Sequence, residues 1–301
     1  MDNLSKEIEK LKKEKNAIIL AHYYVDGAVQ DVADYIGDSF YLAKVAAKND
    51  ADMIVFAGVS FMGESAKILS PDKKVCMAEA TADCPMAHMV TLDEIKKVRS
   101  EYDDLAVVCY INSTAEIKTA SDVCVTSSNA VNIVKKLKEK NIFFIPDRNL
   151  GNYVAKQVPE KNFVYCNGFC PIHNDVTVDM VKKAKESYPD AKFAVHPECR
   201  PEILELADYI GSTSGIIDFC KKTEAREIII GTVEGVCHQI EKHVPEKKLI
   251  GMEPKLFCVN MGKITLENVY DALKYEDNQM EVDERIAAES KKPLGRMLEL
   301  G

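Results

Sequence analysis

Short apolar runs and amphipathic segments alternate along the whole chain. Runs such as NAIILAHYY, LAVVCYINS and AKFAVHPEC have the length and β-branched content of buried strands. Segments such as SFYLAKVAAK carry apolar residues at helical spacing, a second run such as DMIVFAG follows, and after another helix a short strand leads to a cysteine. The order strand-helix-strand-helix-strand calls for parallel pairing with helices on both faces of the sheet. The pattern therefore predicts an α/β fold made of three-layer α/β/α units with short parallel sheets.

This order of elements occurs three times. The three runs end in His22, Tyr110 and His196, which are 88 and 86 positions apart. Other landmarks keep nearly the same steps, and an internal repeat is best sought before any other feature. They are Ser39, Ser127 and Thr213; Pro71, Pro159 and Pro245; Cys84, Cys170 and Cys258; and Thr91, Thr177 and Thr265.

We interpret the repeat as three homologous α/β units. The expected boundaries are residues 1–96, 97–182 and 183–270, with a C-terminal segment at 271–301. No Gly/Ser-rich linker separates the units, so we expect them to pack around a pseudo-threefold axis. Because ligands gather at the carboxyl ends of parallel strands, three such edges facing one axis would form a single shared site.

The composition excludes several classes of protein. The chain has 39 Lys+Arg against 48 Asp+Glu, a net charge of −9, and its basic residues form no stripe, which argues against a nucleic-acid partner. No window approaches the roughly 18 uninterrupted apolar residues of a membrane span, and no export signal is recognisable. We therefore expect a cytoplasmic protein without membrane contact.

Three of the ten cysteines are set apart by the repeat. Only Cys84, Cys170 and Cys258 occupy one equivalent position in all three units, so a shared site would receive one thiolate from each. Three converging thiolates suit a soft metal or an iron–sulfur cluster. A [4Fe–4S] cluster with three protein ligands leaves one iron open, and an open metal position allows Lewis-acid catalysis.

Two other interpretations of these cysteines stay open at this point. Zinc could be bound by the same three thiolates and a water, or the three could be buried thiols left by duplication. Cys166 could be mistaken for a ligand, because it lies four residues before Cys170, but its spacing has no counterpart in the other units. Apolar patterns place five further cysteines in the core: Cys76, Cys109, Cys124, Cys220 and Cys237.

Anion contacts are predicted at three helix starts. Ser39, Ser127 and Thr213 each stand at a predicted helix N-terminus, where backbone N–H groups and the helix dipole favour negative charge. Any one of them alone would be read as an N-cap. Three at equivalent places suggest substrates with about three anionic groups.

Polar residues at the strand ends supply candidate acid–base chemistry. Such a group offers donors, acceptors and a carboxylate that can exchange protons with a carbonyl or imine. His173, three residues after Cys170, could hydrogen-bond a substrate or a cluster sulfur. The strand-end residues are His22, Tyr23, Tyr24, Tyr110, Asn112, His196 and Glu198.

These residues resemble the quinolinate synthase family of de novo NAD biosynthesis. The similarity covers essentially the whole chain and includes AHYY, QDVADYIGDS, GVSFMGESAKILSPDK, YINST, TSSNA, NGFCPIH, HPEC, GSTSG and CVNM. The resemblance implies three homologous domains, a [4Fe–4S] cluster on three cysteines, and condensation of iminoaspartate with dihydroxyacetone phosphate to quinolinate, phosphate and two waters. Iminoaspartate would arrive free or from a transient partner, L-aspartate oxidase. The phosphate and two carboxylates of these substrates match the three helix starts.

Carried over to this chain, the resemblance assigns roles to individual residues. It implies that Cys84, Cys170 and Cys258 hold the cluster, and that Phe61 and Met62 form a wall of the cavity. Glu198 would be the principal proton-transfer base. The resemblance places the other strand-end residues apart from Tyr23 around the substrates, with His22, Tyr24, Tyr110 and His196 assisting catalysis, and makes Ser39, Ser127 and Thr213 anion contacts.

Two other functional classes are distinguishable by simple observations. A zinc lyase or hydrolase on the same thiolates would be colourless, whereas an anaerobically purified cluster protein is brown. A non-catalytic ligand-binding protein would use the helix starts without a metal, so Cys84→Ala would leave its ligand affinity unchanged.

Overall fold

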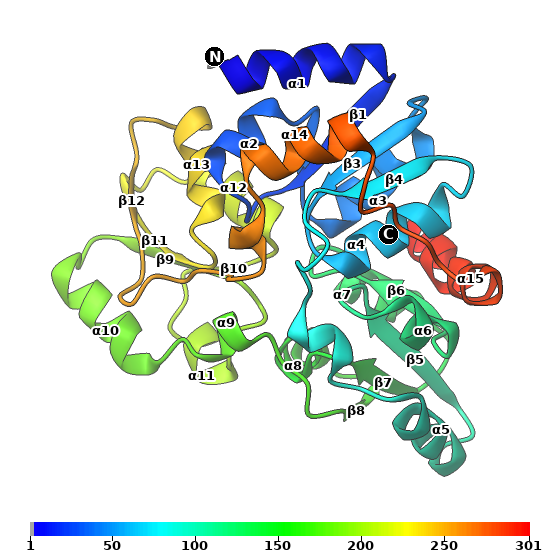
Figure 1. The fold of residues 1–301 in the computed structure, drawn as a ribbon. Helices are drawn as coiled ribbons and strands as arrows, with labels where there is room; N and C mark the ends of the chain where they lie inside the picture. Colours follow the sequence, from blue (N-terminus) through cyan, green and yellow to red (C-terminus); the bar gives the residue numbers. More distant parts are fainter. Residues whose placement is uncertain (1–2) are drawn as a thin grey trace.

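Three four-stranded sheets, each with all its strands parallel, organise the computed structural model, which describes residues 3–301 (Figure 1). In every sheet the second strand of the unit lies at one edge, followed by the first, third and fourth strands. Helices lie on the faces of the sheets, because a parallel connection needs a crossover and the crossovers here are helical. The prediction of an α/β fold with three parallel-sheet units is confirmed.

The first sheet follows an N-terminal helix. The apolar strand β1 pairs with β3 from Ala17↔Met53 to Ala21↔Ala57, and both strands are buried. The helix α3 begins after Asp38, whose carboxylate accepts a hydrogen bond from the Tyr41 N–H at 3.0 Å. The elements are α1 (Asn3–Glu14), β1 (Ala17–His22), α2 (Gly27–Val32), β2 (Tyr35–Gly37), α3 (Ser39–Lys48), β3 (Met53–Ala57), α4 (Ser60–Leu69), β4 (Lys74–Met77), η1 (Pro85–His88) and α5 (Leu92–Glu101).

The second sheet repeats this pattern, and its third helix is capped by a buried carboxylate. Oδ1 of Asp147 accepts hydrogen bonds from the N–H groups of Asn149 and Leu150 at 2.8 and 2.9 Å. The elements are β5 (Leu105–Tyr110), α6 (Ala115–Thr119), β6 (Val123–Val125), α7 (Ala130–Lys136), β7 (Asn141–Ile145), α8 (Arg148–Gln157), β8 (Asn162–Tyr165), α9 (Pro171–Asn174) and α10 (Val178–Ser187).

The third sheet is covered on both faces by its own apolar clusters. Phe193 and Val195 of its first strand pack into one cluster, and Ala194 packs into the other, as alternation along a strand requires. The elements are β9 (Lys192–Val195), α11 (Pro201–Leu204), β10 (Tyr209–Ile210), α12 (Thr213–Lys222), β11 (Glu227–Gly231), α13 (Gly235–His243), β12 (Lys248–Ile250), η2 (Met261–Lys263), α14 (Leu266–Tyr275) and α15 (Glu284–Leu300).

One detail of the predicted order is wrong. Each unit has a fourth strand, β2, β6 or β10, which the expected strand-helix-strand-helix-strand order omits. These strands are only two or three residues long, so they contain too few residues for a period of two to be recognised. Each lies at a sheet edge beside the first strand of its unit.

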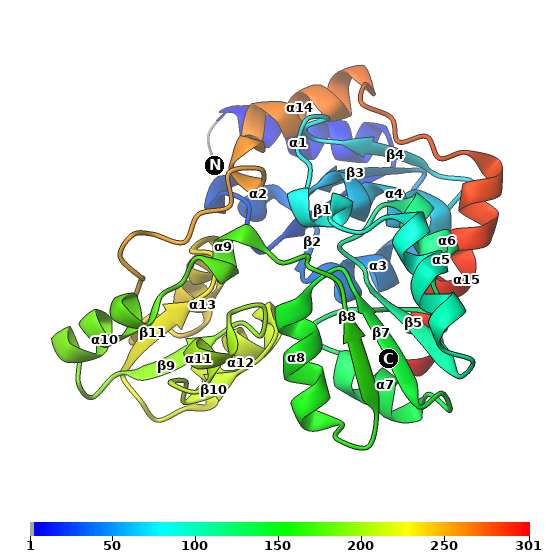
Figure 2. The same ribbon diagram turned by 90° about the horizontal axis from the view of Figure 1, so that it is seen from below.

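The first two sheets share one continuous hydrophobic core, whereas the third has separate clusters. Figure 2 shows the first and second sheets close together and the third set apart. The helices α1 and α14 lie side by side, and α15 packs on α6 and β6, so the chain ends return to the first two sheets. Among residues 3–301, no helix combines the length and apolar content of a membrane span.

The expected unit boundaries at residues 96, 182 and 270 fall inside helices. These helices are α5, α10 and α14, each of which follows the cysteine of its unit. A helix therefore ends each unit. We propose that the three units meet the following segment at equivalent positions within these helices.

Candidate active site

Side chains from all three sheets line one cavity of about 230 Å³. Fifteen of the candidate residues from the sequence contribute to its wall, whereas Tyr23 does not. The structure thus brings together residues from positions 22 to 258. They are His22, Tyr24, Ser39, Phe61, Met62, Cys84, Tyr110, Asn112, Ser127, Cys170, His173, His196, Glu198, Thr213 and Cys258.

The first strand of each unit delivers a polar residue to this cavity. His22 is the last residue of β1, Tyr110 is the last residue of β5, and His196 directly follows β9. All three are buried. The carboxyl ends of the strands therefore face the cavity, which is the usual place for ligands in parallel sheets.

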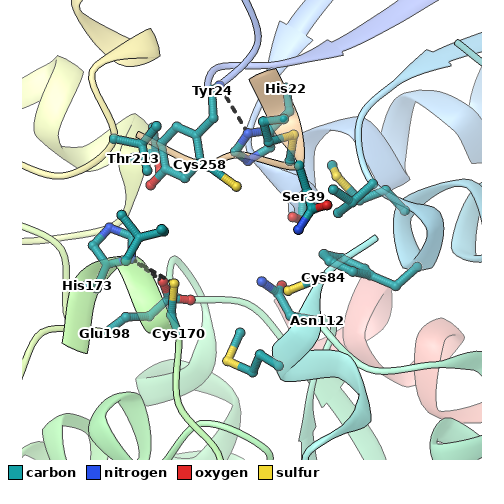
Figure 3. A pocket seen from close by; sticks show the side chains of 18 of the residues that line it. His22, Tyr24, Ser39, Cys84, Asn112, Cys170, His173, Glu198, Thr213 and Cys258 are labelled. Atoms are coloured by element: carbon teal, nitrogen blue, oxygen red, sulfur yellow. Dashed lines mark hydrogen bonds and ion pairs between the residues drawn. The ribbon is translucent and has the colours of Figure 1, made fainter. Parts of the chain in front are cut away.

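Each predicted cysteine ligand stands just before a short helix. Cys84 and Cys170 are the N-caps of η1 and α9, and Cys258 lies shortly before η2. Figure 3 shows their sulfur atoms facing the same open space from different elements. Backbone N–H groups at these helix starts act on the sulfurs and lower the pKa of each thiol, although burial raises it more.

The three thiols oppose one another's ionisation. Burial, followed by the charges of Glu198 and Cys258, raises the pKa of Cys84 to about 12. Burial, Glu198 and then Cys84 raise the pKa of Cys170 well above its usual value. Three thiolates could therefore coexist here only with a cation between them, which fits a soft metal centre or an iron–sulfur cluster.

A second donor set lies in the same cavity. Cys170, His173 and Glu198 offer ligand atoms that all lie within 4.8 Å of one another. Nδ1 of His173 is 3.2 Å from Sγ of Cys170, and Nε2 of the same ring is 2.9 Å from Oγ1 of Thr232. Thiolate, imidazole and carboxylate are also the ligands of mononuclear zinc. The cavity can therefore hold a metal, and its donors suit more than one kind of centre.

Glu198 is a buried carboxylate surrounded by donors. Its Oε2 lies 2.7 Å from Nδ1 of His173 and 3.4 Å from Nδ1 of His196. Burial raises the pKa of Glu198, but the two histidines and a hydrogen bond from Tyr110 outweigh this effect and lower it to about 2. The carboxylate is therefore ionised at neutral pH.

Two histidines of the cavity are neutral. Burial lowers the pKa of His22 to about 4 and that of His196 to about 3, even though Glu198 favours their charged forms. Nε2 of His196 lies 3.3 Å from Oγ of Ser127. Neutral imidazoles can both donate and accept hydrogen bonds, which suits contact with substrate oxygens.

The predicted helix starts differ in detail from the expectation. Ser39 and Thr213 are first residues of α3 and α12, and the caps are their predecessors Asp38 and Ser212. Ser127 lies outside α7, which begins at residue 130. It is part of a turn before this helix, which the Asn129 side chain closes, because its Oδ1 accepts a hydrogen bond from the Thr126 N–H at 2.7 Å. All three hydroxyl residues nevertheless line the cavity.

The family model for the quinolinate synthetase A protein matches residues 6–299. The chain belongs to the quinolinate synthetase A family. Its curated relatives agree. The chain is 56% identical over 293 residues to a quinolinate synthase of Fusobacterium nucleatum, covering 97% of this chain and 98% of the relative. The family expected from the motifs is confirmed.

More distant members match over similar lengths. A quinolinate synthase of Caldicellulosiruptor bescii is 51% identical over 298 residues, covering 99% of this chain and 98% of the relative. One of Aquifex aeolicus is 48% identical over 302 residues, covering 99% and 94%. The similarity to other quinolinate synthetase A proteins therefore extends through all three sheets.

Sequence reasoning missed three buried polar residues around the site of this quinolinate synthetase A protein. Thr232 Oγ1 lies 2.7 Å from the Tyr24 hydroxyl, which also lies 2.9 Å from Thr213 Oγ1. Asp147 Oδ2 accepts from the Cys170 N–H at 3.1 Å, and Asn149 Nδ2 donates to Glu198 O at 3.0 Å. A signal existed for Thr232 alone, because positions 58, 146 and 232 keep the steps of 88 and 86 and mark the ends of the third strands.

One cavity residue of the family member has an unused hydrogen-bonding atom. Oδ1 of Asn112 is buried and has no partner within residues 3–301. Buried polar atoms are nearly always satisfied, so an exception in a cavity calls for an outside donor. A substrate hydroxyl or amine would supply one.

Proposed function

We propose that this chain is a quinolinate synthase that condenses iminoaspartate with dihydroxyacetone phosphate, releasing phosphate and two waters. The observation that carries the proposal is the meeting of three equivalent thiols and three equivalent polar strand ends in one cavity. A binding protein needs neither the thiols nor a buried ionised carboxylate. The family membership and the names of the relatives support the same activity.

Cys84, Cys170 and Cys258 would hold a [4Fe–4S] cluster in this cavity. The backbone N–H groups that act on all three sulfurs, and the mutual opposition of their charges, support a cationic cluster as their common partner. When bound through three cysteines, such a cluster has one iron free to supply Lewis-acid chemistry to a substrate nitrogen or oxygen. Cys166 does not line the cavity, and its Sγ lies 2.9 Å from Pro146 O.

The polar residues of the cavity would bind the substrates. Ser39, Ser127 and Thr213 present hydroxyl donors to the phosphate and carboxylates, and Ser39 and Thr213 add the positive ends of α3 and α12. Neutral His22 and His196 can donate to the same oxygens without competing for charge. Phe61 and Met62, both buried in α4, exclude water on one side.

Glu198 would act as the principal base in proton removal from the condensing substrates. Its carboxylate is ionised and almost fully buried. Two anionic substrates beside it would raise its pKa and make it a better proton acceptor when the cavity is filled. His22, Tyr24, Tyr110 and His196 would assist by holding hydroxyls during dehydration and ring closure.

A zinc enzyme is the second candidate, and the Cys170, His173 and Glu198 donor set favours it. Zinc would need these three residues but neither Cys84 nor Cys258. The cluster candidate therefore requires Cys84 and Cys258, whereas the zinc candidate does not.

The activity is tested by supplying iminoaspartate and dihydroxyacetone phosphate to anaerobically purified protein and measuring quinolinate by chromatography. The wild type and Cys166→Ala should form quinolinate, and Cys258→Ala should not. Iron-replete wild type that forms no quinolinate would refute the proposal. Equal turnover by Cys258→Ala would favour the zinc candidate.

A further inference from the structure

Lys118 is a fully buried lysine that lies beside the active-site cavity without lining it. It belongs to α6, on the second sheet. Within residues 3–301 its Nζ donates to Ser113 O at 2.6 Å and lies 5.6 Å from the centre of the Phe61 ring, with no carboxylate among these contacts. A buried ammonium without a carboxylate is costly, so its retention calls for a reason.

Both contacts of Lys118 hold parts of the cavity wall. Ser113 closes a tight turn, in which its Oγ donates to Tyr110 O at 3.0 Å and its N–H donates to Ile111 O at 2.8 Å. This turn carries Asn112, whose unpartnered oxygen is in the cavity wall. Phe61 belongs to α4, on the first sheet. One ammonium therefore connects cavity walls from two sheets.

Two buried cysteines lie on the neighbouring strands. Cys109 and Cys124 are directly paired across β5 and β6, and both are fully buried. Burial raises the pKa of Cys109, but the hydrogen bond of Cys124 and the charge of Lys118 outweigh it and lower the pKa to about 7. The Cys109 Sγ–H donates to Tyr110 O at 3.3 Å, so this thiol contacts the same turn that Lys118 contacts.

We propose that Lys118 is a positioning residue for catalysis, whose ammonium fixes the Tyr110–Ser113 turn against the Phe61 ring. The inference rests on the proposed function, because the turn and the ring are the parts that would contact the substrates. If the ammonium is removed, both the Tyr110–Ser113 turn and the Phe61 ring lose a contact that fixes their position. An apolar side chain of similar size would fill the same space without the cost of burying charge. Lys118 therefore lowers the free energy of unfolding but positions the cavity walls.

The test compares Lys118→Met and Lys118→Arg with the wild type in kcat, KM, thermal midpoint and iron content. Lys67→Met is the control, because half-buried Lys67 on α4 donates to two backbone carbonyls, at 2.8 and 2.9 Å, and does not line the cavity. We expect Lys118→Met to keep the wild-type iron content and an equal or higher midpoint. Its kcat/KM should fall by about tenfold or more, mainly through KM, and Lys118→Arg should recover part of this loss.

Two results would contradict the role proposed for Lys118. A kcat/KM of Lys118→Met within about twofold of the wild type would overturn it. So would a Lys118→Met protein that is insoluble or has a lower midpoint, because Lys118 would then be structural. If the wild type itself forms no quinolinate, the proposed function fails, and this result differs from an active wild type with an equally active variant.

Discussion

Glu198 and His173 face each other at 2.7 Å, from Oε2 to Nδ1, and both side chains are buried. The same Nδ1 lies 3.2 Å from Sγ of Cys170, and the opposite nitrogen lies 2.9 Å from Oγ1 of Thr232. One imidazole therefore connects the proposed base, a proposed cluster ligand and a hydroxyl that reaches Tyr24. Changes to any of these groups should therefore affect the chemistry of the site.

Glu198→Gln keeps the size of the side chain and removes its charge. Because the amide cannot accept a proton, turnover should fall by about 10²- to 10⁴-fold while iron content stays at the wild-type level. The measurement is the steady-state rate of quinolinate formation together with iron analysis. Exposed Glu202 provides the control, and Glu202→Gln should be fully active. Normal turnover of Glu198→Gln would move the base role elsewhere.

Thr232→Val removes the hydroxyl between Tyr24 and His173 and keeps the shape of the side chain. Both partners, buried His173 and partly buried Tyr24, lose a hydrogen bond, so we expect kcat/KM to fall about tenfold and the free energy of unfolding to fall by about 1–3 kcal/mol. Thr232→Ser should restore most of both. Kinetics and denaturant unfolding of the three proteins provide the comparison. A fully active Thr232→Val would show that this hydroxyl serves packing alone.

Asp147→Ala removes the N-cap of α8 and the acceptor of the Cys170 N–H. Loss of the cap should lower the free energy of unfolding by about 1–2 kcal/mol. Loss of the Cys170 contact should also lower iron content, since that backbone holds a proposed ligand. Asp283→Ala removes the cap of α15, far along the chain from any cysteine, and should cost stability alone. Equal iron content in both variants would contradict the positioning of Cys170 by Asp147.

The repeat made much of the site predictable from the sequence. The spacing of His22, Tyr110 and His196 identified the first strands, and the carboxyl ends of parallel strands meet ligands, so residues far apart in sequence were expected to come together. The same register separated Cys84, Cys170 and Cys258 from seven other cysteines. These inferences depend only on the repeat spacing and on the order of strands and helices, both of which can be read from the sequence.

The repeat marks position 232, but the contacts that tertiary packing gives to a side chain cannot be predicted in this way. Thr232 and Asp147 were not recognised because a lone hydroxyl or carboxylate after a strand has many ordinary uses, and its partner is in another unit or another turn. Ser127 was placed at a helix start, but the Asn129 side chain closes the preceding turn and delays the helix. The short edge strands were missed because they are extended through hydrogen bonds to the neighbouring strand, which a pattern of two or three residues does not reveal.

Acid should remove a contribution of Glu276 to stability. Hydrogen bonds from Lys15 and Lys74 lower the pKa of Glu276 to about 2 from its ordinary 4.5, and they connect the residue after α1, the start of β4 and the end of α14. A lowered folded-state pKa stabilises the protein above about pH 4.5, and this contribution disappears as the pH falls toward 2.

Thermal midpoints of the wild type and Glu276→Gln should therefore differ at pH 6 and converge as the pH approaches 2. Glu289→Gln removes one partner of an exposed pair on α15 and should change the midpoint little at either pH. A difference between wild type and Glu276→Gln that stays constant across this range would contradict the ion-pair account.

The most direct test of the metal centre is the iron and acid-labile sulfide content of Cys84→Ala, purified anaerobically beside the wild type and Cys166→Ala. The wild type and Cys166→Ala should contain about four irons and four sulfides per chain, and Cys84→Ala should lose most of both. Wild-type iron and sulfide content in Cys84→Ala would contradict the account, because the cluster would then be held without Cys84.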